Sequence, residues 1–272
     1  MNRYLFAFGL RSSRGGLIAW SIFFILYGIL MVYLFNPMQD IADTIAEYAE
    51  QFGAMFEIFA GDIGSLLNPD GTLSLGKWLS LEYLSMWPMM MAVYAIFFGG
   101  NIVAREADKG TLDMLLSQPV KRTHVIMSRF AVFPLLLLGV VAASLIGIVI
   151  GMAIIGTTTD IAGICLVFLP GVLLPLAVAS YSMLFSCIFL EPRKVLMAAG
   201  SLTGLFFLLN ILSDTIDSLD WIGYLSIFHY YAPGEIAADF NVDWLGIGVY
   251  IAIIAICTVA SIFVFQRRDI AA

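Results

Sequence analysis

The charged stretch from residue 105 to residue 129 reads R-E-A-D-K-G-T-L-D-M-L-L-S-Q-P-V-K-R-T-H-V-I-M-S-R and lies between two long apolar runs. Charge is scarce elsewhere: 61% of the 272 residues are hydrophobic and only 12% are charged. Globular proteins usually contain about 25% charged residues. The composition therefore predicts an integral membrane protein, and it marks the loop 105–129 as the segment that contacts something outside the membrane.

Working outward from this loop, six apolar runs are long enough to cross a bilayer as helices of about 20 residues. They cover residues 17–35, 84–104, 130–155, 161–190, 195–212 and 244–265. The runs lack the alternation of barrel strands, so we expect an all-α membrane protein with six transmembrane helices in a single domain, residues 1–272. The fourth run is overlong and contains Pro170 and Pro175, which predicts a tilted, kinked or partly interfacial helix.

Basic residues fix the orientation of these helices. If the N-terminus is cytoplasmic, Lys77 is the only one of the 13 basic residues that falls on the outer side, and most of the 20 acidic residues fall there too. Cytoplasmic loops of membrane proteins are enriched in Lys and Arg. Both termini and the loop 105–129 are therefore expected in the cytoplasm, in a plasma membrane of prokaryotic type.

The N-terminal segment has the pattern of a short amphipathic helix. Arg3, Arg11 and Arg14 share one helical arc, and Leu5 and Phe8 point away from it. This pattern predicts either a helix lying on the inner leaflet or simple anchoring by positive charge.

The outer side is expected to carry two further segments. The long outer loop 36–83 contains apolar residues at spacings of three to four, which predicts an amphipathic helix over its first half: Ile41, Ile45, Tyr48, Phe52, Phe56 and Phe59. Before the last run, an aromatic cluster predicts a half-inserted interfacial segment: Trp221, Tyr224, Phe228, His229, Tyr230 and Tyr231.

Small residues repeat every four positions in two of the runs. The third run has Gly139, Ala143, Gly147 and Gly151, and the fifth has Gly200 and Gly204. Such spacing lets helix backbones approach closely, either within the bundle or between two copies of the chain.

Several classes of function are disfavoured by what the sequence lacks. It contains no G-x-x-x-x-G-K-[ST] loop for nucleotide binding, and no run has an ionisable residue near its middle. Ion-coupled carriers usually need such residues at membrane depth. His124 and His229 fall on opposite sides of the membrane, so they cannot share a metal or a catalytic dyad. We therefore expect no catalytic residue, cofactor or metal in this chain, and no nucleic acid as partner.

The loop itself predicts a short cytoplasmic helix. The second span is expected to continue past the membrane to Gly110, a residue suited to a helix C-cap. Thr111 then caps a helix that Pro119 ends, over residues 111–119. Its apolar stripe consists of Leu112, Leu115 and Leu116. Exposed leucines in the cytosol favour a binding partner that covers them.

These residues resemble a known signature. The pattern E-x-x-x-G-T-L-x-x-L-L-x-x-P-V-x-R is similar to that of permease subunits of ABC transporters in the type-2 exporter family; it is present here as Glu106, Gly110, Thr111, Leu112, Leu115, Leu116, Pro119, Val120 and Arg122. The six runs, the amphipathic N-terminus, the long first outer loop, the partly inserted segment and the C-terminal F-x-R-R-D-I also resemble this family. Lys121 departs from the small or polar residue often found there.

The resemblance implies that helix 111–119 is a coupling helix that docks on a separate ATP-binding subunit, where ATP and Mg²⁺ are held. Thr111, Leu112, Leu115, Leu116 and Pro119 would contact that ATPase, and Glu106 and Arg122 would hold the helix at its angle. It further implies a second permease subunit, identical or paralogous, with substrate passing between the two. The alternative is a membrane scaffold or sensor that recruits a cytosolic partner through the same loop without transport.

Overall fold

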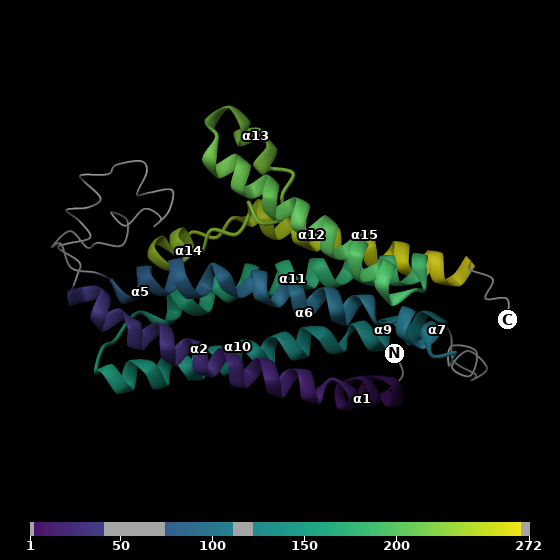
Figure 1. Ribbon diagram of the computed structural model, residues 1–272, viewed down its shortest axis with the longest axis horizontal. Coiled ribbons are helices and arrows are strands. Elements are labelled where there is room, and N and C mark those ends of the chain that lie inside the picture. Colours follow the sequence, from purple (N-terminus) through teal and green to yellow (C-terminus); the bar gives the residue numbers. More distant parts are fainter. Residues whose placement is uncertain (1–2, 41–73, 111–121, 268–272) are drawn as a thin grey trace.

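The computed structural model describes residues 3–40, 74–110 and 122–267, and this part of the chain is helical and contains no strand. Figure 1 shows long helices lying side by side. The elements are α1 (Arg3–Ser12), α2 (Arg14–Asp40), α5 (Leu75–Trp78), the π-helix η2 (Leu79–Leu84), α6 (Met86–Gly100), α7 (Ala104–Asp108), α9 (Arg122–Phe130), α10 (Val132–Ile155), α11 (Ile161–Phe189), α12 (Pro192–Thr215), the 3-10 helix η3 (Asp217–Leu219), α13 (Asp220–Gly223), α14 (Pro233–Asp239) and α15 (Trp244–Arg267).

Six helical stretches in this part of the chain are long and apolar enough to span a membrane, as the sequence predicts. They cover Arg14–Met38, Leu75–Gly100, Thr123–Ile155, Ile161–Phe189, Pro192–Thr215 and Trp244–Arg267. Large apolar side chains such as Ile18, Leu138 and Ile256 are exposed on their outer faces, where lipid would cover them. The all-α membrane fold is therefore confirmed.

The helices on both sides extend into the outer loop predicted at residues 36–83, so its predicted bounds are wrong. Helix α2 continues to Asp40, and the second spanning stretch begins at Leu75 rather than at residue 84. Hydropathy marks the part of a helix that crosses hydrocarbon, whereas the extension of the second stretch is helical because it packs: Trp78, Leu79 and Tyr83 are buried. The predicted amphipathic helix in the first half of the loop lies outside the described residues.

The N-terminal helix lies at the same end of the bundle as the end of the last helix (Figure 1). Helix α1 is separate from α2 and packs on α9, α10 and α2, with Phe6 and Leu10 against the core and Arg11 exposed. The side chains of Arg3 and Leu5 lie outside the described part. Helix α1 and the last turns of α15 lie at the same end as α7 and α9 (Figure 1), which we call the inner end. The positive-inside rule assigns it to the cytoplasm.

Helix α11 lies at the centre of the bundle, where it contacts α6, α12, α14 and α15. It runs without interruption through Pro170 and Pro175, both of which are buried. Helix α2 packs mainly on α10, and these two helices lie together along one side of the molecule (Figure 1). The bundle thus has two main packing units, α2 with α10 and α6 with α11, α12 and α15.

Glycines allow the closest of these contacts. A Cβ added at Gly147 of α10 would lie 2.5 Å from the carbonyl oxygen of Ile25 in α2, and one added at Gly151 would lie 2.7 Å from the Cβ of Val32. On α6, a Cβ at Gly99 would collide with the carbonyl oxygen of Ala179 in α11. The small residues of the third run therefore pack within the chain, whereas a Cβ at Gly200 would meet no atom of the described residues within 4 Å.

Buried polar side chains in the outer half also have partners across helices. The indole nitrogen of Trp78 donates to the carbonyl of Met31 at 3.0 Å, and that of Trp87 donates to the Ser144 hydroxyl at 3.0 Å. In the predicted interfacial segment, Tyr231 donates to the carbonyl of Leu84 at 2.8 Å. Polar groups in an apolar medium are costly unless paired, so these bonds fasten α5 to α2, α6 to α10 and the segment around Tyr231 to η2.

We predict that Gly147→Ala destabilises the chain by about 1–3 kcal/mol, because the new methyl group must push α10 away from the backbone of α2. Gly200→Ala is the matched control: it adds the same group to a helix where nothing lies in its way, so helix propensity leaves stability unchanged or raises it by up to about 1 kcal/mol. Thermal unfolding of the purified chain in detergent measures both. Equal shifts in Tm would contradict the close approach of α2 and α10.

Candidate functional site

The structure describes only part of the predicted site. Glu106 lies in α7, Gly110 is the second residue after the end of α7, and Arg122 begins α9. The side chain of Arg122 lies outside the described part, as do the five residues of the predicted docking helix: Thr111, Leu112, Leu115, Leu116 and Pro119. The structure therefore defines the two chain segments that lead into and out of the loop, which we call the loop root: residues 101–110 and 122–130.

The incoming segment is not the continuous helix that the sequence predicts. Helix α6 ends at Gly100, residues 101–103 form a turn, and α7 follows. The Ser186 hydroxyl of α11 accepts hydrogen bonds from the backbone nitrogens of Val103 at 3.1 Å and Ala104 at 2.9 Å. The first backbone nitrogens of a helix have no partner within that helix. Because α11 supplies an acceptor for those at the start of α7, the helix can break between α6 and α7.

The ends of α6 and α7 are both stabilised by hydrogen bonds within a few residues. The Asn101 side-chain amide donates to the carbonyl of Phe97 at 2.7 Å, and the Asn101 backbone nitrogen donates to the same carbonyl at 3.3 Å at the end of α6. After α7, Gly110 has a φ of 65°, a left-handed conformation that favours glycine, and its nitrogen donates to the carbonyl of Ala107 at 3.1 Å. The predicted role of Gly110 as the residue that ends this helix is confirmed.

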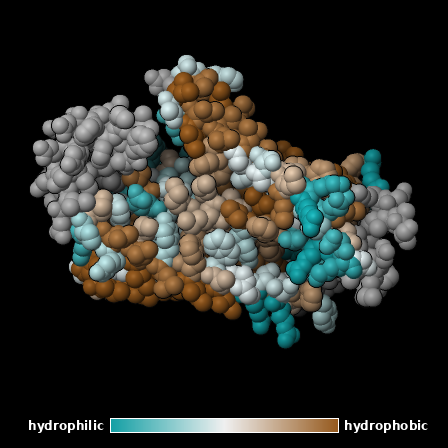
Figure 2. Space-filling model, viewed as in Figure 1, coloured by the Kyte–Doolittle hydropathy of each residue, from teal (hydrophilic) through white to brown (hydrophobic). Residues whose placement is uncertain are grey.

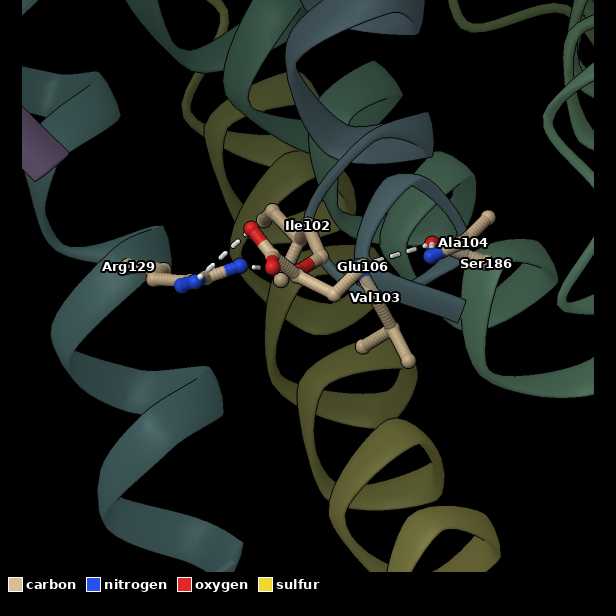
Figure 3. Close-up of polar contacts among 6 residues, drawn as sticks. All are labelled: Ile102, Val103, Ala104, Glu106, Arg129 and Ser186. Carbon is tan, nitrogen blue, oxygen red and sulfur yellow. Dashed lines mark hydrogen bonds and ion pairs between the residues drawn. The ribbon is translucent and has the colours of Figure 1, made fainter. Parts of the chain in front are cut away.

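One arginine joins the two sides of the loop root. Arg129 of α9 donates from Nη1 to the carbonyl of Ile102 at 2.8 Å and pairs through Nη2 with Glu106 Oε1 at 3.2 Å. Figure 3 shows Arg129 reaching from α9 toward Ile102 and Glu106, with Ser186 on the far side of the turn. The side chains of Arg129 and Glu106 are only 14% and 24% exposed, so water screens this pair less than it would a surface pair.

Glu106 thus has a contact within the loop root that the sequence did not predict. It pairs with Arg129, and the predicted role of Arg122 stays a prediction because the Arg122 side chain lies outside the described part. The sequence alone assigned Arg129 no role beyond leading into the third span. Glu106 and Arg129 are far apart in the sequence, and only the fold brings their side chains together. Ser186 carried no signal, since it is one small residue inside a long apolar run.

The loop root is packed against most of the inner end. Helix α7 contacts α11 and α12, and α9 contacts α1, α10 and α15. Figure 2 shows hydrophobic residues over much of the visible face and hydrophilic residues gathered at the end where α7 and α9 lie. A force on the ends of the loop is consequently applied to several spanning helices at once. Among the described residues, no group of three or more His, Cys, Asp or Glu side chains is placed to hold a metal.

Six spanning helices, exposed apolar faces and a basic inner end define a multi-pass α-helical protein of the cell membrane. The family model described as "Multidrug efflux system permease Rv1217c, C-terminal domain" matches residues 3–266, nearly the whole chain. The chain belongs to this family, and it is the membrane-spanning permease of a transport system rather than an enzyme. A comparison with curated proteins finds no match.

We predict that Arg129→Met loosens the loop root more than Glu106→Gln does, because the first change removes both the bond to Ile102 and the ion pair, and the second removes the ion pair alone. Hydrogen bonds to charged groups contribute about 1.5–3 kcal/mol, so amide exchange in residues 101–108 should become about tenfold faster or more in Arg129→Met. Hydrogen-exchange mass spectrometry of the purified chain measures this.

Glu191→Gln provides the control for these variants. Glu191 pairs with Lys194 at 2.7 Å at the start of α12, but both side chains are 60% exposed, so the loss of this pair should leave exchange in residues 101–108 unchanged. Unaltered protection in Arg129→Met would show that the arginine does not hold the root.

Proposed function

We propose that the chain is the permease subunit of an ATP-driven exporter of the ABC type-2 class, that it works as a dimer with an identical or paralogous permease, and that a separate ATP-binding subunit drives it. The ATPase would dock on residues 111–119. Two features support this proposal: the signature from Glu106 to Arg122, and a loop root that is rigidly tied to the bundle. The second of these is the structural observation that carries it.

The geometry of the root explains how work could enter the spans. If closure of two ATP-binding subunits moves the loop, α7 moves with it, and the bonds of Arg129 to Ile102 and Glu106 make α9 follow. The bonds of Ser186 to Val103 and Ala104 carry the same displacement to α11, at the centre of the bundle. Rigid helices that shift against one another in this way would alternate between inward and outward openings.

The chemistry of ATP hydrolysis belongs to the partner in this proposal. The sequence has no phosphate-binding loop, so ATP and Mg²⁺ would be held by the ATP-binding subunit and none of the residues named here would perform catalysis. The spans lack central charge and are rich in aromatic residues, which favours a hydrophobic or amphipathic cargo such as a drug, a lipid or a peptide. The family description, a multidrug efflux permease, supports the first of these.

We predict that Leu115→Asp abolishes coupling. Central interface residues commonly contribute 2 kcal/mol or more to binding, so a carboxylate in place of an apolar contact should weaken ATPase binding by at least about tenfold. The measurement is permease-stimulated ATP hydrolysis and drug efflux in vesicles that contain both subunits. Leu115→Met keeps an apolar side chain of similar volume and serves as the control, with near-normal activity expected.

The same experiment separates this proposal from the alternative of a recruiting scaffold. A scaffold would bind its cytosolic partner without ATP-dependent efflux in either the wild-type chain or the Met variant. If Leu115→Asp leaves ATPase binding and efflux intact, residues 111–119 are not the coupling element.

A further inference from the structure

A cavity of about 270 Å³ lies at the inner end, beside the loop root. Helix α1 and the turn after it line it with Phe8, Ser12 and Ser13, and the end of α6 and the following turn line it with Phe97 and Asn101. Arg105 of α7 lines it too. Sites that enclose drug-sized ligands occupy about 300–1,000 Å³. This cavity therefore suits one end of a larger molecule.

The polar groups of the cavity favour an anion. Three charged residues line it, and two of them, Glu106 and Arg129, neutralise each other across 3.2 Å. The third, Arg105, is exposed and has no ion-pair partner among the described residues. The side chains that line the cavity therefore carry a net positive charge, and the hydroxyl groups of Ser12 and Ser13 add neutral donors.

Nearby acceptors that would oppose an anion are already engaged. The carbonyl oxygen of Ile102 accepts from Arg129 at 2.8 Å, and that of Phe97 accepts from the side chain of Asn101 at 2.7 Å. The planar guanidinium of arginine matches the geometry of a phosphate group, to which it can donate two parallel hydrogen bonds. A phosphate anion is the ligand chemistry that these groups share.

The apolar wall indicates where that phosphate comes from. Phe8 and Phe97 are 62% and 51% exposed, and they lie on the first helix and on a spanning helix at the inner end. A free phosphate would gain nothing from two large aromatic side chains. A phospholipid would place its phosphate beside Arg105 and its glycerol and upper acyl carbons against the rings, at the level where short amphipathic helices lie in a membrane. Anionic lipids are enriched on the cytoplasmic leaflet.

We propose that this cavity binds the headgroup of an anionic phospholipid of the inner leaflet, with Arg105 as the phosphate ligand. Nothing in this site depends on the proposed partner ATPase. Because Glu106 and Arg129 line the same cavity, the bound headgroup lies against the ion pair that closes the loop root.

The test is native mass spectrometry of the purified full chain in detergent, titrated with dioleoylphosphatidylglycerol or with dioleoylphosphatidylcholine. The wild-type chain should retain the anionic lipid in preference. Arg105→Gln should bind it about tenfold more weakly, since a charge-assisted contact is lost. Ser12→Phe, which fills the cavity from the end of α1, should have a similar effect while thermal unfolding reports that both variants remain folded.

Arg11→Gln is the matched control. Arg11 is also an exposed arginine of the inner end, but it does not line the cavity, so its loss should leave binding of the anionic lipid within about twofold of wild type. Equal losses of lipid binding in the Arg11 and Arg105 variants would show that general charge attraction holds the lipid, and would overturn the proposed site. Displacement of the lipid by equimolar inorganic phosphate would overturn the lipid as its occupant.

Discussion

Every backbone N–H and C=O in a membrane-spanning segment must find a partner within the protein, and the inner end of this chain depends on how that constraint is met at one helix break. Residues 101–103 follow the second spanning stretch and separate it from α7, which frees donors and acceptors. Ser186 accepts from the nitrogens of Val103 and Ala104, Arg129 donates to the carbonyl of Ile102, and the side chain of Asn101 donates a second hydrogen bond to the carbonyl of Phe97. Three of these four bonds come from other helices, so satisfying the backbone also ties the loop root to the bundle.

The helices joined in this way are themselves closely packed. Gly99 lets α6 lie against the backbone of α11, and Gly147 lets α10 lie against that of α2. Contacts between backbones leave little room for adjustment by side chains, so each pair moves as a unit. A displacement of the loop root would then move these packed pairs of helices as rigid units. This is the mechanical property that a permease driven from outside the membrane needs.

Hydropathy predicted the six spanning helices and charge bias predicted which ends lie together, because both depend on composition summed over many residues. Gly110 was also predictable, since a left-handed residue at the end of a charged helix strongly favours glycine. The break at residues 101–103 and the extension of the second helix to Leu75 were not, because tertiary contacts determine both. The same holds for Arg129: it finds Ile102 and Glu106 only when α7 and α9 are brought together, and no local pattern marks that pairing. Ser186 was the least predictable of these residues, because it is a single hydroxyl in an apolar run and its role depends only on the backbone nitrogens that lie beside it.

The central claim is that the loop held by this root contacts an ATP-binding subunit. Photo-cross-linking in intact cells tests it most directly, with p-benzoylphenylalanine in place of Leu115 or, for comparison, in place of Trp221 at the outer side. The account predicts a cross-link from position 115 to a protein that binds ATP, at greater yield than any from position 221. Cross-links from position 115 that form only within the permease itself would contradict it.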